Sequence, residues 1–277
     1  MNKNFKLKSY LDTNALINLW TNFVKINNEI DSNININKTV FKECCTSIYA
    51  IDEMLISKTK DLNNLLNNIS FLLIFQNIPI IKPFPNIVKT LKPNKNLTID
   101  HFENKDAIAN ILFRCATQFF LPESQKWLKY HIQKKEEFAE ASSWFIKPYG
   151  SNKANYSKKK ISLENKIDKL IRNHDINEPE SFLHFCMELF VALRNRELKK
   201  PANISREKIR KPPEKSLNQQ YDFYHLCYSK YFNEFVTDDI VLSWILETLN
   251  KKNITSVKIY NSKSFFDKQS RELALRK

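Results

Sequence analysis

The sequence predicts an α/β fold in which helices cover a mostly parallel central sheet. Near both ends of the 277-residue chain, short apolar segments alternate with segments whose apolar residues recur every three or four positions. Such alternation is typical of strand–helix–strand units, in which the helical crossover makes consecutive strands parallel. The middle of the chain carries mainly helical patterns. We therefore expect one domain over residues 1–277, with a mainly helical insertion over residues 98–205.

The N-terminal third is expected to supply three strands and two helices. Residues 5–11 predict a first strand, and residues 15–26 predict the helix that follows it. A second short strand is expected over residues 46–49, and it runs into a helix over residues 51–66. Residues 78–84 form an apolar run closed by prolines, which indicates a third, buried strand.

The rest of the chain divides into the inserted helices and a second alternating part. Residues 201–216 hold three prolines and seven charged residues, so they predict a linker or an exposed loop between the two. Four helices are expected before this loop, over residues 106–120, 123–138, 162–173 and 178–199. After it we expect a helix, a strand, a helix and a strand, over residues 221–232, 234–237, 240–249 and 257–260.

The composition narrows the classes of function. The single glycine, Gly150, argues against a glycine-rich phosphate-binding loop, because such a loop needs glycines for close backbone approach. Five cysteines without a C-x-x-C pair indicate free thiols in a reducing compartment, so we expect a cytoplasmic protein. The most apolar stretch, residues 69–81, is far shorter than the roughly 20 residues of a spanning helix, so no membrane partner is expected.

The charge of the chain predicts a polyanionic partner. Lysine and arginine total 44 against 30 aspartates and glutamates, a formal charge of +14. A positive surface attracts polyphosphates over about 8–10 Å, so nucleic acid is the partner that we expect. Between residues 151 and 215, 16 basic residues face nine acidic ones; an exposed loop of low complexity is the alternative explanation. The residues predicted there to bind nucleic acid are Lys158, Lys159, Lys160, Arg206, Arg210 and Lys211.

Four acidic residues stand where predicted strands meet helices. Asp12 and Asp239 each follow a strand and precede a helix, and Asp222 opens the helix before the later strand. Glu53 lies on the helix after the second strand. The functional crevice of an open parallel sheet forms at the carboxyl ends of strands where the winding reverses, so the four carboxylates are expected to converge. The alternative is that the three aspartates are helix N-caps, a position that aspartate favours.

Converging carboxylates suit a divalent metal ion. Hard oxygen ligands favour Mg²⁺ or Mn²⁺ over zinc. Such an ion lowers the pKa of bound water and clamps phosphate oxygens, which is the chemistry that phosphodiester hydrolysis needs. Clustered carboxylates repel one another, so their pKa values are expected to be raised without metal. The pattern therefore predicts an Mg²⁺- or Mn²⁺-dependent hydrolase of nucleic acid.

Several segments of the chain resemble the PIN-domain nucleases. Residues 9–16 (SYLDTNAL) look like that family's opening, where a strand ends in Asp, then Thr or Ser, then Asn or Ser. Residues 46–55 (TSIYAIDEML) resemble its second strand and the helix that carries its Glu. Residues 221–242 are similar to its final block, an Asp-led helix before a strand ending Thr-x-Asp, and residues 257–266 look like its closing strand. The chain departs from the family in its length, because a long helical interval precedes the Asp-led helix.

The resemblance implies a PIN-like α/β/α sandwich and metal-dependent phosphodiester cleavage. It implies Asp12, Asp222 and Asp239 as metal ligands, with Glu53 as a further ligand or as the base that orients water. Asp238 could replace Asp239 or be a bystander. Asp52 and Glu43 are weaker alternatives to Glu53. Two polar side chains would hold the carboxylates in place, those of Asn14 and Thr237.

These observations lead us to expect a metal-dependent endonuclease, with RNA favoured over DNA, that acts as a toxin or defence effector. An unrestrained nuclease would harm its own cell, so an antitoxin, an inhibitor or another regulatory protein is an expected partner, and an oligomeric gate would serve the same end. One alternative is a non-catalytic nucleic-acid-binding or protein-binding module on a PIN-like scaffold. Another is a different α/β enzyme in which the acids are only caps.

Overall fold

The computed structural model describes all the predicted strands and most of the predicted helices at least in part. The loop expected over residues 201–216 lies outside the described residues, except for Pro201. The described residues are 7–19, 21, 41, 43–56, 78–91, 97–117, 120–130, 133, 160–194, 197–199, 201 and 219–275.

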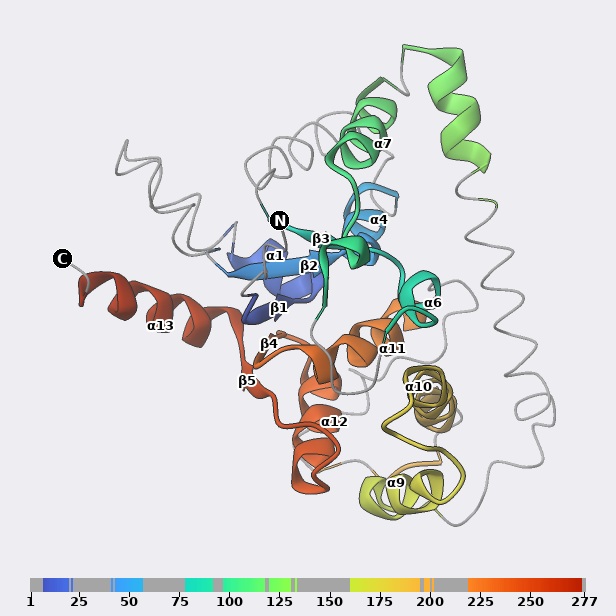
Figure 1. The fold of residues 1–277 in the computed structure, drawn as a ribbon, viewed down its shortest axis with the longest axis vertical. Coiled ribbons are helices and arrows are strands. Elements are labelled where there is room, and N and C mark those ends of the chain that lie inside the picture. The colour runs from blue at the N-terminus through green and yellow to red at the C-terminus, as the bar shows by residue number, and fades with distance from the viewer. Residues whose placement is uncertain are drawn as a thin grey trace.

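Among these residues, five short strands form one sheet at the centre of the molecule (Figure 1). They are hydrogen-bonded in the order β3-β2-β1-β4-β5, and each pair of neighbours is parallel. The expected α/β fold with a parallel sheet is confirmed. The strands are β1 (Ser9–Leu11), β2 (Cys44–Ser47), β3 (Ile80–Ile81), β4 (Glu234–Val236) and β5 (Lys258–Tyr260).

The winding of the chain reverses beside β1. The first three strands extend the sheet in one direction, and the chain then returns to lay β4 along the free side of β1. In this pair Leu11 is opposite Val236, and the N–H of Asp12 donates to the carbonyl oxygen of Val236 at 3.1 Å. The carboxyl ends of β1 and β4 therefore lie side by side, at the place where open parallel sheets bind their ligands.

The helices divide between the two faces of the sheet. Because crossovers between parallel strands are right-handed, helices before and after the reversal lie on opposite faces. The contacts agree: α1 (Thr13–Leu19) packs against α4 (Ile48–Ile56) and α13 (Ser262–Ala274), whereas α11 (Gln219–Tyr228) packs against α12 (Ile240–Lys251). This arrangement is consistent with an α/β/α sandwich.

Aromatic side chains fasten the short strands to α11. Tyr10, in β1, is fully buried; its ring stacks on Tyr228 with centroids 5.1 Å apart and lies at the same distance from Phe235 of β4. At the start of α4, Tyr49 stacks on Tyr224 with centroids 4.5 Å apart. Each such pair contributes about 0.5–1.5 kcal/mol beyond the area that it buries, which supports strands with few ladder hydrogen bonds.

The segment between β3 and β4 supplies the inserted helices. After α6 (Phe84–Ile87) come α7 (Lys105–Thr117) and a helix over residues 122–130, followed by α9 (Leu163–Ile171) and α10 (Pro179–Arg194). Figure 1 shows α7 at the opposite end of the molecule from α9 and α10.

The later inserted helices pack on the core. Helix α10 contacts α11 and α9, and α9 contacts α12. At the contact between α9 and α12 the ammonium group of Lys252 donates to both carboxylate oxygens of Asp168, at 2.6 and 2.7 Å. The second half of the insertion is therefore bound to the two helices that flank β4.

Two element boundaries differ from the sequence-based expectation. The second strand begins at Cys44 and ends at Ser47, and helix α4 starts at Ile48, so the expected strand over residues 46–49 was wrong by two residues. Residues 262–266, expected to belong to the closing strand, instead open helix α13. The side chain of Asn261 accepts a hydrogen bond from the N–H of Ser264 at 2.8 Å, and this local bond favours the start of a helix.

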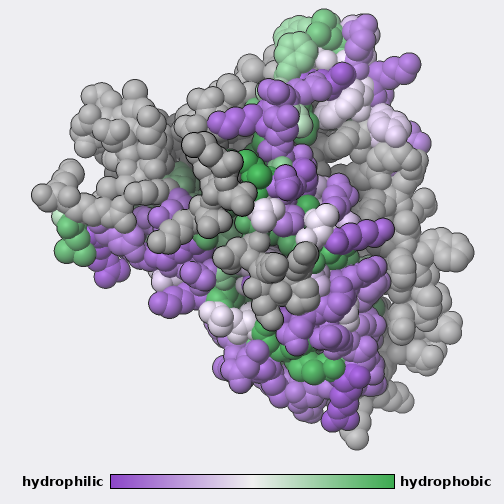
Figure 2. Space-filling view, in the orientation of Figure 1, coloured by the Kyte–Doolittle hydropathy of each residue, from purple (hydrophilic) through white to green (hydrophobic). Residues whose placement is uncertain are grey.

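The described surface is largely polar in the view of Figure 2, with an apolar tip between α7 and residues 122–130. Phe120 and Leu121 are exposed there. None of the described helices has both the length and the apolar character needed to cross a bilayer.

Candidate functional site

Asp12 stands at the carboxyl end of β1, inside the reversal point. Its side chain is only 3% exposed. Oδ1 accepts a hydrogen bond from the N–H of Ala15 at 2.7 Å, so Asp12 caps helix α1, as the alternative interpretation held. The hydroxyl of Thr237, just after β4, also hydrogen-bonds the carboxylate. This bond helps to hold the carboxylate of Asp12 in place.

Glu53 reaches the same place from helix α4. Its side chain is buried, and Oε2 accepts a hydrogen bond from the hydroxyl of Thr13, the residue that follows Asp12. Nε2 of His225 lies 3.7 Å from the same oxygen. The loop that carries Asp12 therefore orients the glutamate as well. The side chain of Asp52 lies outside the described residues, and Glu43 is exposed just before β2, at the opposite end of the sheet.

Asp222 approaches from the other face of the sheet. It lies in the first turn of α11, which leads into β4, so this turn is near the carboxyl ends of the strands. Loss of water contact raises the pKa of Asp222 well above its ordinary value, and the negative charges of Asp239, Glu53 and Asp12 raise it further. The other three predicted carboxylates therefore all act electrostatically on Asp222, which requires that each of them lies near it.

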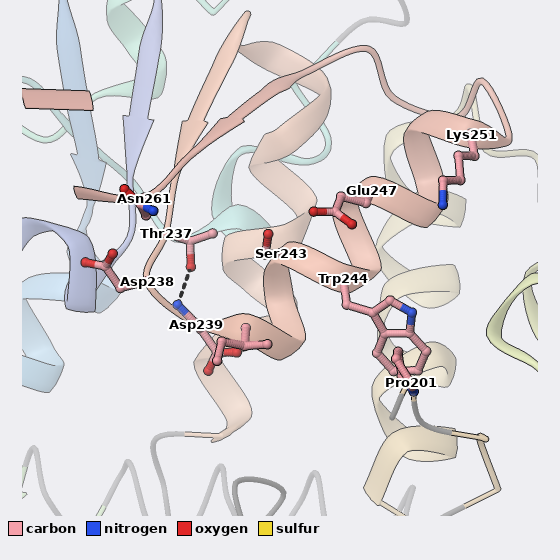
Figure 3. A pocket seen from close by; sticks show the side chains of 10 residues that line it. Pro201, Thr237, Asp238, Asp239, Ser243, Trp244, Glu247, Lys251 and Asn261 are labelled. Carbon is pink, nitrogen blue, oxygen red and sulfur yellow. Dashed lines mark hydrogen bonds between the residues drawn. The ribbon is translucent and has the colours of Figure 1, made fainter. Parts of the chain in front are cut away.

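Asp239 and Asp238 are neighbours in the chain but have different hydrogen-bond partners. Oδ1 of Asp239 accepts hydrogen bonds from two backbone N–H groups of α12, at 2.6 and 3.0 Å, so this cap uses one carboxylate oxygen. Asp238 points away from it (Figure 3), accepting from the side chain of Asn18 at 2.8 Å and from the N–H of Ser262 at 3.0 Å. The charge of Asp239 raises the pKa of both Asp12 and Asp222.

The electrostatic state of Asp12 is unusual for an aspartate. Burial raises its pKa to about 7; the imidazole of His225 and the hydrogen bonds from Thr237 and Ala15 oppose the rise, and Asp239 adds to it. Among the described residues, no lysine or arginine forms an ion pair with Asp12, Asp222 or Asp239. The described lysine and arginine side chains therefore do not neutralise these three aspartates, which lie near the carboxyl ends of β1 and β4.

At the opposite end of the sheet, a buried carboxylate is neutralised by lysine side chains. Glu234 opens β4 and is buried, yet it accepts hydrogen bonds from Lys268 at 2.5 Å and from Ser9 at 2.7 Å, with Lys8 at 3.5 Å. Burial alone would raise the pKa of Glu234, but Lys268, Ser9 and Lys8 outweigh that effect and lower it. Glu234 is thus a buried carboxylate that has two lysine partners, unlike Asp12 among the described residues.

His225 is a buried member of the site that the sequence did not indicate. It is 2% exposed and follows Asp222 by one helical turn on α11. Nδ1 lies 2.5 Å from the hydroxyl of Tyr10, and Nε2 lies 3.5 Å from the hydroxyl of Thr13. The spacing Asp-x-x-His, which places both side chains on one helix face, was the available signal.

The remaining predicted residues are not gathered at the site. Asn14 is exposed in the first turn of α1, and its role stays a prediction. Lys160 is exposed just before the β-bridge at Ile161. No group of three or more His, Cys, Asp or Glu among the described side chains is arranged to hold a metal ion. The other residues predicted to bind nucleic acid lie outside the described part of the chain: Lys158, Lys159, Arg206, Arg210 and Lys211.

A pocket of about 540 Å³ adjoins the acids and follows one side of α12 (Figure 3). It begins at Thr237 and Asp239 and continues past Trp244 to Lys251, in the last turn of the helix. Pro201, from the end of the inserted segment, lines it as well. A ligand that reached the acids could therefore extend along this helix.

Comparison with known proteins was made for the whole chain. No family model matches it, and neither a curated protein nor a solved structure is found to be similar to it. The function must therefore be inferred from the chemistry of its own side chains.

Proposed function

We propose that the chain is a divalent-metal-dependent endonuclease on a PIN-like scaffold, with RNA as its preferred substrate. One observation carries the proposal: carboxylates from distant parts of the chain gather near the carboxyl ends of β1 and β4, where the charges of Asp12, Glu53 and Asp239 all act on Asp222. Ligand sites of open parallel sheets form at such a reversal point.

The chemistry of these donors suits Mg²⁺ or Mn²⁺. The proposed ligands are carboxylate oxygens, which these hard ions prefer. The raised pKa of Asp12 and Asp222 expresses repulsion and loss of water, both of which a divalent cation would relieve. When bound, the ion supplies a hydroxide from water near neutral pH and offsets charge on the phosphate.

The surrounding residues would keep the donors in place. Asp12 and Asp239 are each fixed by the first turn of a helix, and Thr13 orients Glu53 through its hydroxyl. Thr237 bonds both to Asp12 and to the N–H of Asp239, and so links the ends of the two strands. Hydrogen bonds of this kind fix the orientation of ligating side chains.

The charge of the chain supports a nucleic acid as substrate. The formal charge is +14, although the acidic site itself is negative, so basic residues elsewhere must attract the phosphate backbone. We propose a cytoplasmic toxin or defence ribonuclease, restrained by an antitoxin, an inhibitor, another regulatory protein or self-association.

The test is a digestion of tRNA, mRNA and single- and double-stranded DNA with purified full-length protein, titrated with Mg²⁺ and Mn²⁺. Cleavage of RNA should require the metal. Asp12→Asn and Asp239→Asn should abolish it, because asparagine caps a helix nearly as well as aspartate but lacks the charge. The matched control is Asp267→Asn, an exposed acid-to-amide change on α13 that should leave cleavage intact.

Equal cleavage by the Asp12→Asn protein would refute the proposal. Salt-sensitive binding of nucleic acid without cleavage under either metal would instead favour a non-catalytic binding module on the same scaffold. Metal binding that is unchanged in both site variants would favour the interpretation in which the acids are only caps.

A further inference from the structure

The pocket beside the acids has one aromatic end and one acidic end. Figure 3 shows Trp244 and Pro201 together at one end, with Thr237 and Asp239 toward the other. Trp244 is partly exposed, so part of its indole ring is accessible to a ligand. Flat aromatic surfaces of this kind are where unpaired bases stack in proteins that bind single-stranded nucleic acid.

The charges in the pocket disfavour a phosphate group along its length. Two lining residues carry carboxylates, Asp239 and Glu247, against one ammonium group, from Lys251. The carboxylate of Asp238 is turned away and bonded to Asn18 and Ser262. A neutral, planar ligand with hydrogen-bonding edges suits such a lining better than an anion does. The volume, about 540 Å³, is within the range of about 300–1,000 Å³ that is usual for small-ligand pockets.

Polar groups stand in a row along the same side of α12. Ser243, Glu247 and Lys251 are spaced four residues apart, so they lie one above another on the helix. Glu247 precedes Lys251 in the orientation that favours an ion pair, yet of these two described side chains neither pairs with the other. A carboxylate acceptor and an ammonium donor are thus both presented to the pocket.

We propose that this pocket binds one unpaired base of the substrate, stacked on Trp244, and that guanine is the preferred base. The carboxylate of Glu247 can accept two hydrogen bonds side by side, and the Watson–Crick edge of guanine alone presents two adjacent N–H donors to it. The proposal rests on the proposed nuclease function, because the pocket opens beside Asp239. In this proposal, residues of α12 recognise the base that determines where the RNA is cut.

The experiment measures binding, so that it does not depend on cleavage. Fluorescence anisotropy is recorded with the full-length Asp12→Asn protein in Mg²⁺, using short labelled oligouridylates that carry one central guanine, adenine, cytosine or uracil. The guanine oligomer should bind most tightly. Trp244→Ala should weaken that binding by about 5- to 150-fold, the usual loss when a stacking aromatic is truncated, and Trp244→Phe should retain most of it.

Two further variants separate base recognition from damage to the fold. Glu247→Gln changes an exposed side chain and should equalise the affinities for the four oligomers. Trp127→Ala, a matched truncation of a partly buried tryptophan that packs beside Arg114, should not change the affinity. Circular dichroism and thermal unfolding verify that each variant is folded.

The two proposals fail in different ways. Equal binding of all four oligomers by the Asp12→Asn protein, no binding of any, or full binding by Trp244→Ala would each overturn the base pocket, whether or not the wild-type protein cleaves RNA. Guanine-dependent binding that needs Trp244, in a wild-type protein that never cleaves, would keep the pocket and overturn the nuclease.

Discussion

Asp12→Asn should stabilise the metal-free protein, and the gain should grow as the pH rises. Burial first, and the charge of Asp239 in addition, raise the pKa of Asp12 from 3.8 to about 7. A carboxyl group with a higher pKa in the folded state binds more protons folded than unfolded, so the free energy of unfolding falls as the pH rises between these values. Asparagine keeps the cap and carries no charge, so the variant escapes this loss.

The size of the effect follows from the shift. One pKa unit corresponds to about 1.4 kcal/mol, so ionised Asp12 costs the fold about 4 kcal/mol at pH 8 but only about 2 kcal/mol at pH 5. The difference in unfolding free energy between variant and wild type should therefore widen by about 2–3 kcal/mol over that range. The raised pKa of Asp222 acts in the same direction, because removing the charge of Asp12 also relieves Asp222.

The measurement is urea unfolding, followed by circular dichroism, at several pH values between about 5 and 8 with chelator present. Asp267→Asn serves as the control, because its exposed carboxylate should give no comparable pH dependence. Adding Mg²⁺ near pH 8 should stabilise the wild type and not Asp12→Asn. A difference between wild type and Asp12→Asn that stays constant with pH, or that shrinks as the pH rises, would refute the reasoning.

Three further changes test how the site and its scaffold are held. Tyr10→Phe removes the hydroxyl beside His225, and it should lower the unfolding free energy by about 1–3 kcal/mol and slow cleavage. Unchanged stability and an unchanged cleavage rate would show that this contact contributes to neither. Lys268→Met should cost about 2–4 kcal/mol by leaving Glu234 short of a partner, measured by urea unfolding. Because the pKa of Glu234 is lowered in the fold, the ion pair stabilises above about pH 4.5, so this loss should fade as the pH drops; an equal loss in acid would contradict it. Phe185→Ala, at a fully buried position of α10, should cost about 3–5 kcal/mol, and a melting temperature near the wild-type value would show that α10 does not support the fold.

The positions of Asp12 and Asp239 could be predicted because the signal is local. Each follows a short apolar run and precedes a helical pattern, and the structure has a strand before and a helix after each of them. Their meeting could be predicted only through the rule that ligand sites of parallel sheets form where the winding reverses. The strand order bears out that step, since β4 lies beside β1.

Other features depended on contacts that no local pattern carries. Asp238 and Asp239 differ by one position, yet Asn18 and Ser262 hydrogen-bond the carboxylate of Asp238 and turn it away from that of Asp239. His225 joins the site through the hydroxyls of Tyr10 and Thr13, both more than 200 residues earlier in the chain. A histidine within an apolar helix pattern gives no sign of such a partner.

The start of α13 was missed for a different reason. Residues 261–266 were expected to continue the closing strand because residues 257–266 resemble that strand of the PIN-domain nucleases, yet Asn261 and Ser264 form a helix-start hydrogen bond. That capping pattern was present in the sequence. At a short surface segment such a cap favours the start of a helix.

The tether between α9 and α12 has a mechanical consequence. Asp168 forms an ion pair with Lys252, whose neighbour Lys251 lines the proposed base pocket, and Pro201 lines that pocket from the end of the same inserted segment. A protein that grasped α9 and displaced it would pull on the last turn of α12 while remaining distant from the acids. Such a partner would alter the proposed base pocket, and it would thereby inhibit the proposed cleavage without covering the carboxylates.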